Sequence, residues 1–267
     1  DTPIAKGNEA TAAIGADSFA YGSSSVAIGG GTAYGDKAGT QGNVTNQGGA
    51  VAIGWVTAKG NRAVALGGIN TTSATGDNSF ATSGGVANGD NASALNGSQA
   101  TGDNTFAAVG GTASADSAIS IGNGSLANQT NTVALGKSTN ATGASAIAIG
   151  DAVTATSTAA TSIGSNGTKA TAYGATAIGR NAKVTAEKSV ALGFDLNVAN
   201  SGSTLVGYNS NILANQATGI GSTINIDSTA QYATGIGYQV DVTGKNGIAI
   251  GSSDETTKKV IAASENS

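Results

Sequence analysis

The segment Thr132–Gly150 reads TVALGKSTNATGASAIAIG and contains one short phrase twice. The two copies are TVALG at Thr132–Gly136 and AIAIG at Ala146–Gly150. Both alternate apolar and small residues and end on a glycine. A further glycine, Gly143, stands midway between the two closing glycines. Because Gly and Asn favour turn conformations, each unit predicts two short extended stretches joined by two tight turns.

The phrase recurs along most of the chain at a nearly constant step. Its closing glycines in the regular part are Gly122, Gly136, Gly150, Gly164, Gly179, Gly193, Gly207, Gly221, Gly237 and Gly251. Before Gly122 the phrase is looser and its step slightly shorter, as in SFATS at Ser79–Ser83, ASALN at Ala92–Asn96 and TFAAV at Thr105–Val109. Short units that cannot bury their own apolar face predict stacking into a solenoid. The fold class is therefore all-β, a parallel β-solenoid of about 14-residue coils.

The phrase has a bulky face and a small face. In SVALG at Ser189–Gly193, Val190 and Leu192 point to one side, and Ala191 points to the other. We expect the bulky side to fill the interior, and the small side to form a subunit interface with closed cyclic symmetry. The same core role is expected of the equivalent residues Val26, Ile28, Val51, Ile53, Val64, Leu66, Ile119, Ile121, Val133, Leu135, Ile147, Ile149, Ile248 and Ile250.

Composition excludes several functional classes. The 267 residues include 42 Gly and one Pro, and neither Cys nor His. Disulfides, thiol nucleophiles and Cys/His zinc sites are therefore ruled out, and we expect no enzyme activity, no cofactor and no metal. The net charge of −4 argues against nucleic acid as a partner. A glycine in every half-unit also opposes the coiled coil that the heptad-like half-spacing would otherwise suggest.

The repeat unit, with its SVALG-type phrase and the Ala-Thr-Gly half at Ala141–Gly143, resembles the head repeat of YadA-like trimeric autotransporter adhesins. The resemblance is closest over Gly122–Gly251 and extends more loosely back to Ala12. It implies a left-handed parallel β-roll in which three chains pack as a homotrimer. It also implies display on the bacterial cell surface, with the outer-membrane anchor outside this chain. The implied partners are host extracellular matrix proteins and cell-surface receptors or glycans.

The domain organisation follows from the repeat phase. We expect one head over residues 1–251 and a C-terminal linker over residues 252–267. The phase breaks near residues 30–49, because Gly29 and Gly54 are separated by somewhat less than two repeats.

The position after the closing glycine is a candidate ligand-binding position. It holds Trp55, Arg180, Phe194, Tyr208 and Tyr238, and Phe194 and Tyr208 are expected to stack. Aromatic residues dominate binding hot spots. The alternative is that these rings only cover neighbouring coils.

Two charged groups have a functional and a structural interpretation. Arg180, Lys183 and Lys188 would meet an acidic ligand such as a sulfated glycan, or form a solvated turn together with Glu187. A ladder of evenly spaced carboxylates in matching turns would recruit cations, or consist of ordinary turn residues. Its members are Asp77, Asp90, Asp103 and Asp116.

Two rival functions share the solenoid fold. A passive spacer of an adhesin fibre predicts that substitutions at Trp55, Arg180 or Tyr208 leave adhesion unchanged. A monomeric solenoid that binds a flat ligand surface requires a regular Thr column, and the Thr residues do not keep one register.

Overall fold

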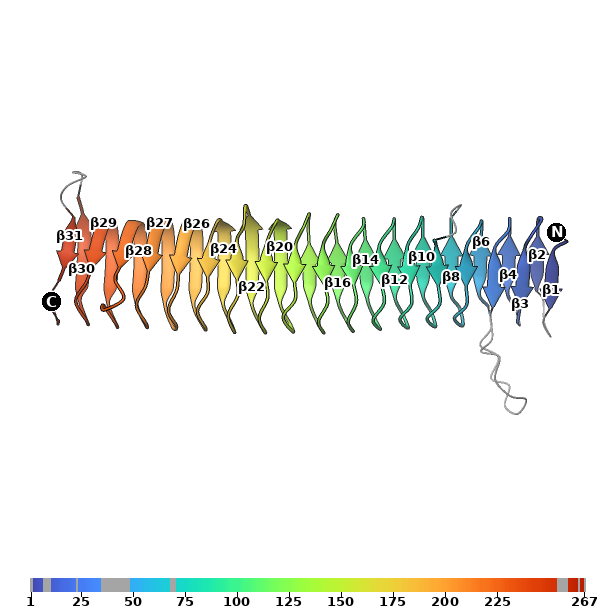
Figure 1. The fold of residues 1–267 in the computed structure, drawn as a ribbon, viewed down its shortest axis with the longest axis horizontal. Coiled ribbons are helices and arrows are strands. Elements are labelled where there is room, and N and C mark those ends of the chain that lie inside the picture. Colours follow the sequence, from blue (N-terminus) through green and yellow to red (C-terminus); the bar gives the residue numbers. More distant parts are fainter. Residues whose placement is uncertain are drawn as a thin grey trace, which may run out of the picture. The chain divides into compact units, whose positions relative to one another are not determined.

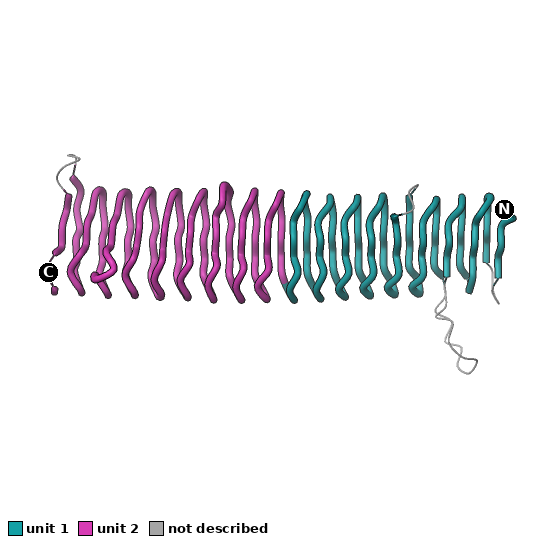
Figure 2. Tube along the Cα trace, viewed as in Figure 1, with its two compact units in different colours: residues 1–131 teal, residues 132–267 magenta. Residues whose placement is uncertain are grey.

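The computed structural model describes residues 2–6, 11–22, 24–34, 49–67, 71–253, 259–263 and 265–266. Over these ranges the chain forms 31 β-strands and no helix. It divides into two compact units, residues 1–131 and residues 132–267 (Figure 2). Each unit is a stack of coils, and each coil has a strand in wall A, which carries the repeated phrase, and a strand in wall B, which follows it (Figure 1).

Unit 1 contains short strands only. Wall A consists of β2 (Ala12–Ile14), β4 (Val26–Ile28), β6 (Val51–Ile53), β8 (Val64–Leu66), β10 (Phe80–Thr82), β12 (Ser93–Leu95), β14 (Phe106–Ala108) and β16 (Ile119–Ile121). Wall B consists of β1 (Ile4–Lys6), β3 (Phe19–Tyr21), β5 (Thr32–Tyr34), β7 (Thr57–Ala58), β9 (Ser73–Ala74), β11 (Val86–Ala87), β13 (Gln99–Ala100), β15 (Thr112–Ala113) and β17 (Leu126–Ala127).

Unit 2 begins with similar strands and then acquires longer ones. Wall A contains β18 (Val133–Leu135), β20 (Ile147–Asp151), β22 (Thr161–Ser165), β24 (Thr176–Arg180) and β30 (Ile248–Ser252). Wall B contains β19 (Asn140–Ala141), β21 (Thr154–Ala155), β23 (Lys169–Ala170), β25 (Lys183–Val184) and β31 (Val260–Ala262). Four strands run around the corner from wall A into wall B: β26 (Val190–Val198), β27 (Thr204–Ile212), β28 (Thr218–Ile226) and β29 (Thr234–Val242).

Within each unit, the described coils pair in parallel with their neighbours at equivalent repeat positions. In unit 1 Phe80 pairs with Ser93, and in unit 2 Ile147 pairs with Thr161, so the register advances by one repeat at each step. The predicted parallel β-solenoid is thus confirmed.

The prediction of which face forms the interior was wrong. Ala191 is fully buried between the walls, whereas Val190 and Leu192 lie on the outer face of wall A and are partly exposed. A coil built from two short strands brings its walls too close for bulky side chains from both sides, so alanine fills the interior. None of the other residues assigned to the core is buried: Val26, Ile28, Val51, Ile53, Val64, Leu66, Ile119, Ile121, Val133, Leu135, Ile147, Ile149, Ile248 and Ile250.

Larger interior residues appear in the second half of unit 2, where small residues face them. Leu205 and Ile224 are buried, and Gly219 occupies the position that alanine holds in most coils. A Cβ atom on Gly219 would lie 2.9 Å from Leu205 Cδ1 and 3.3 Å from Ile224 Cγ2. A larger interior side chain in one coil is therefore balanced by a smaller one in the next, which keeps the interior volume nearly constant.

The closing glycine is required by both conformation and space. In unit 2 these glycines adopt φ angles such as 140° at Gly193 and 145° at Gly207, which L-residues rarely adopt. A Cβ atom on Gly193 would lie 1.9 Å from the carbonyl oxygen of Gly207 in the next coil. Successive backbones approach so closely here that no other residue fits.

Two of the predicted boundaries fall partly outside the described residues. Within the phase break, residues 35–48 lie outside them, yet β5 on one side pairs with β7 on the other. In the range predicted as a linker, β31 pairs with β29 at Val240 and Val260, so the sheet continues there. The linker boundary itself stays a prediction.

Candidate functional site

An aromatic edge runs along the corner between wall A and wall B in unit 2. We define it as Arg180, Phe194, Tyr208, Ser222 and Tyr238. The rings of Phe194 and Tyr208 are stacked, with centroids 5.3 Å apart and planes 20° apart. The guanidinium carbon of Arg180 lies 5.0 Å from the Phe194 ring centroid. The structure thus brings three of the sequence-predicted residues together.

The aromatic edge combines local packing with exposed aromatic rings. A cation over an exposed aromatic ring contributes about 0.5–1 kcal/mol, and a stacked pair about 0.5–1.5 kcal/mol. Phe194 is half-buried, but Tyr208 is 52% exposed and Tyr238 is 43% exposed. Ser222 pairs with both tyrosines and has no ring of its own. An exposed ring face can stack against a flat group, such as the C–H face of a sugar or a proline ring.

Trp55 belongs to unit 1 and packs differently. Its side chain is 54% exposed, and its indole covers Gly30, where a Cβ atom would lie 3.0 Å from Trp55 Cε2. Part of the ring therefore covers a neighbouring coil, as the structural alternative predicts.

Sequence reasoning missed a second aromatic pair in unit 1. Tyr21 and Tyr34 stack on wall B, with ring centroids 5.1 Å apart and planes 9° apart. The signal that could have revealed it was the pattern Phe-Ala-Tyr at Phe19–Tyr21, followed one repeat later by Thr-Ala-Tyr at Thr32–Tyr34.

The predicted basic cluster does not form. Arg180 lies at the aromatic edge, and Lys183 begins β25 on wall B. Lys188 lies in the turn that leads back from wall B to wall A. Residues close in sequence are separated because one coil turns through both corners within a single repeat.

Wall B instead carries an outer amide column in unit 2. Asn197 pairs with Asn211, and Asn211 pairs with Asn225. Asn197 Nδ2 donates a hydrogen bond of 2.6 Å to Asn211 Oδ1. The column ends at Asp241, which forms an ion pair of 2.7 Å with Lys259. Asparagine recurring at the repeat spacing is the sequence signal for this surface.

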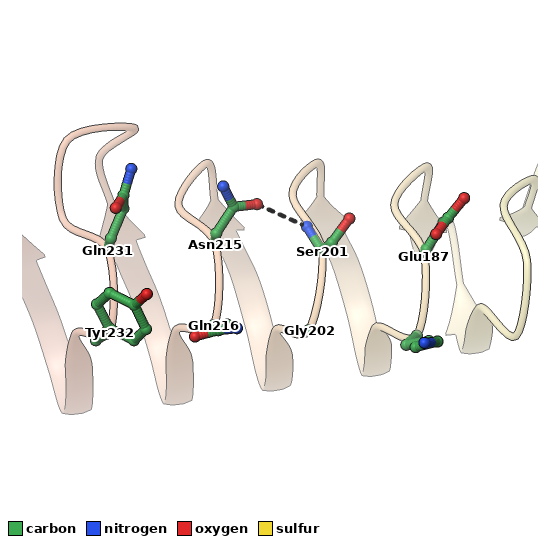
Figure 3. A pocket seen from close by; sticks show the side chains of 8 residues that line it. Glu187, Ser201, Gly202, Asn215, Gln216, Gln231 and Tyr232 are labelled. Atoms are coloured by element: carbon green, nitrogen blue, oxygen red, sulfur yellow. Dashed lines mark hydrogen bonds between the residues drawn. The ribbon is translucent and has the colours of Figure 1, made fainter.

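A shallow polar groove lies on the second corner of unit 2 (Figure 3). Four of its residues, Lys188, Gly202, Gln216 and Tyr232, occupy the same left-handed turn position, with φ angles of 53°, 70°, 54° and 62°. Gly202 provides no side chain, which hollows the groove between Lys188 and Gln216. The remaining lining residues are Glu187, Ser201, Asn215 and Gln231. The backbone N–H of Ser201 donates to Asn215 Oδ1 at 3.1 Å, and the other polar groups leave donors and acceptors suited to a hydroxyl-rich ligand.

The acidic ladder has a structural role. The backbone N–H of Asp77 donates to Asp90 Oδ1 at 2.8 Å, and Asp90 and Asp103 repeat this bond at 2.8 and 3.1 Å. Each carboxylate from Asp90 to Asp116 thus caps the turn of the preceding coil. Within the described residues no group of three or more acidic, His or Cys side chains is placed to hold a metal ion.

Residues 5–32, 113–139 and 170–195 match the family model of the YadA head domain repeat. These three segments therefore carry YadA-like head repeats. No curated protein matches the chain. The matched segments of the YadA-like head occur in both units and include the Arg180–Phe194 part of the aromatic edge. The YadA head family is non-enzymatic in kind.

The outer face of wall A is an apolar surface. Its side chains form two columns, which we call outer column 1, containing Val190, and outer column 2, containing Leu192. Exposure reaches 42% at Ile220 and 65% at Ile250 in outer column 2. In the described part of the chain, no helix is long and apolar enough to cross a membrane.

Proposed function

We propose that this YadA-like head is the adhesive, homotrimeric, left-handed β-roll head of a bacterial surface adhesin. The observation that carries the proposal is the outer face of wall A, which presents partly exposed Ile, Leu or Val at nearly every described coil. Continuous apolar patches beyond a few hundred Å² are rare on monomers. Three copies in a closed ring would bury this face around a common axis.

The adhesive contacts are assigned to the aromatic edge. Tyr208 and Tyr238 present exposed rings, and Arg180 adds a cation over the Phe194 ring that stacks on Tyr208. Lys183 on wall B and Trp55 in unit 1 are the secondary candidates. The ligands we propose are host extracellular matrix proteins and cell-surface receptors or glycans. Three chains would present three copies of each contact, so weak contacts would add through effective concentration.

The head would act on the bacterial cell surface, anchored to the outer membrane by parts of the protein outside these residues. A passive spacer of the fibre remains the rival function, because it needs the same fold and the same trimer but no ligand.

The first test measures assembly and the second measures adhesion. Sedimentation equilibrium should show a species of three chains, and a folded monomer would contradict the proposal. Binding to a panel of immobilised matrix proteins and glycans should then fall at least about tenfold, or about 1.4 kcal/mol per site, in the variant Arg180→Ala/Phe194→Ala/Tyr208→Ala.

The matched control is Tyr173→Ala, since Tyr173 is an exposed tyrosine of the same unit outside the aromatic edge. We expect the control to bind as the native chain does. Equal binding by the native chain and the triple variant, with unchanged circular dichroism, would favour the spacer.

A further inference from the structure

Three consecutive coils of unit 1 depart from the uniform outer face of wall A. In outer column 1, Phe80 pairs with Ser93, and Ser93 pairs with Phe106. In outer column 2 the partners along the same strands are Thr82, Leu95 and Ala108. Elsewhere on wall A of the described coils, outer column 1 holds Val, Ile, Thr or Ala, and outer column 2 holds Ile, Leu or Val.

The two columns exchange volume coil by coil. A large ring at Phe80 or Phe106 stands beside a small residue, Thr82 or Ala108. In the coil between them the order is reversed, with Ser93 beside Leu95. Part of this compensation is packing within the chain, because Ala108 is only 7% exposed. The other five side chains of these coils stay partly exposed, so a second body can pack against the same pattern. In such a packed contact, overfilling and voids both cost stability.

The spacing of this alternation indicates which molecule covers the face. Large and small residues alternate from one coil to the next, so the covering molecule must present side chains at the separation of successive coils. A second copy of this chain has that spacing. In a ring of three, neighbours meet through unlike patches, so outer column 1 of one chain faces outer column 2 of the next.

We propose that these three coils, the register checkerboard, fix the axial register of the chains in the trimer. The proposal rests on the trimer put forward above. In register, Phe80 meets the partner's Thr82, Ser93 meets the partner's Leu95, and Phe106 meets the partner's Ala108. Each level pairs a large side chain with a small one.

The rest of the face cannot choose a register by itself. Coils with Val or Thr beside Ile or Leu are nearly equivalent, so one chain could slide past its neighbours by one coil, about 4.8 Å, and keep similar contacts. A slip in one direction would place Phe80 against the partner's Leu95 and Ser93 against the partner's Ala108. A slip in the other direction would place Phe106 against the partner's Leu95. Either slip overfills some levels and leaves voids in others.

Introduced cysteines can read the register, because the chain has none of its own. The same-level reporter is Val64→Cys with Leu66→Cys, which lie in one coil of wall A. The adjacent-level reporter is Val64→Cys with Ile53→Cys, since Ile53 pairs with Leu66 from the preceding coil. After mild oxidation, covalent links between chains are read on a denaturing gel. In a ring of three, a chain that slips by one coil is displaced relative to both neighbours. At one interface its outer column 1 moves past the neighbour's outer column 2, and at the other interface the relative displacement has the opposite sign. One adjacent-level reporter therefore detects slips in both directions.

The test compares the native checkerboard with a levelled one. The levelled variant carries Phe80→Val, Thr82→Ile, Ser93→Val, Phe106→Val and Ala108→Ile. The matched control is Ile119→Val with Ile121→Leu, which changes the same face but keeps it uniform. In the native and control backgrounds only the same-level reporter should link chains. In the levelled variant we expect the adjacent-level yield to rise by about tenfold or more.

The outcomes separate this proposal from the one on which it rests. A monomer in sedimentation equilibrium would overturn the trimer itself. A trimer whose adjacent-level yield equals its same-level yield in the native background would overturn the register proposal alone. So would a levelled trimer that still links only at the same level. If the levelled chain does not fold, the native adjacent-level yield decides the question.

Discussion

Gly193→Ala tests why the repeated phrase closes on glycine. Gly193 adopts φ 140°, and an L-residue held in such a region costs about 1–3 kcal/mol. The added Cβ would also lie 1.9 Å from the carbonyl oxygen of Gly207. That oxygen belongs to the backbone of the next coil, which is itself paired with Gly221, so it cannot move alone. The coils must separate locally and lose about two ladder hydrogen bonds, at about 1 kcal/mol each.

The expected loss for Gly193→Ala is therefore about 3–5 kcal/mol of unfolding free energy. The matched control is Gly167→Ala, because Gly167 also has a positive φ, 82°, but has no atom within 4 Å of the added Cβ. Only a conformational cost of about 1 kcal/mol remains there. Urea unfolding followed by circular dichroism, at a fixed chain concentration, compares the two variants.

Equal losses for the two variants would refute the close-approach argument and leave the backbone conformation as the sole cause. Hydrogen exchange adds a second readout, because each coil contacts only its neighbours. The loss of protection in Gly193→Ala should centre on β26 and β27 and fade with distance along unit 2.

Three further predictions concern buried groups and one turn. Ser162→Ala should raise the free energy of unfolding by about 1 kcal/mol, because the Ser162 hydroxyl is fully buried without a hydrogen-bond partner. The control is Ser120→Ala, which removes a hydrogen bond of 2.7 Å between the Ser120 and Ser125 hydroxyls. The urea midpoint should rise in the first variant and not in the second. Gly219→Ala should cost about 1–3 kcal/mol by overfilling the interior against Leu205, and a double-mutant cycle with Leu205→Ala should show a favourable coupling. Hydrogen bonds from Thr229, through its backbone N–H first and its hydroxyl second, lower the pKa of Asp227 below its ordinary value of 3.8. The ionised carboxylate thus stabilises the fold above that value and loses this effect as pH falls through the lowered pKa, so Asp227→Asn should flatten the acid limb of a stability–pH profile.

The fold could be predicted from residue types and their spacing along the chain. The spacing of the closing glycines, the β-branched residues and the Asn- and Gly-rich turns indicate strand, turn, strand and turn, and a thin repeat of this kind can only stack. Phe194 and Tyr208 were expected to stack because they occupy the same position in adjacent repeats, and they do. Relations between equivalent positions are readable from the sequence, because the solenoid converts repeat spacing into adjacency.

The sequence did not predict which residues at different positions of one coil lie close together. Arg180, Lys183 and Lys188 are near in sequence, but the corners of the coil separate them. The carboxylate of Asp90 bonds the backbone of the preceding coil, a partner that turn propensity does not reveal.

The sequence by itself determined the period, the strand direction and the glycine at each close approach, because these depend on backbone conformation and on neighbours one repeat away. Only the tertiary structure decided which face turns inward. Alternation along a strand defines two faces without saying which is inside, and the distance between the walls settles the choice. In this chain the walls stand close enough that Ala191 fits between them, and Val190 and Leu192 are left on the outside.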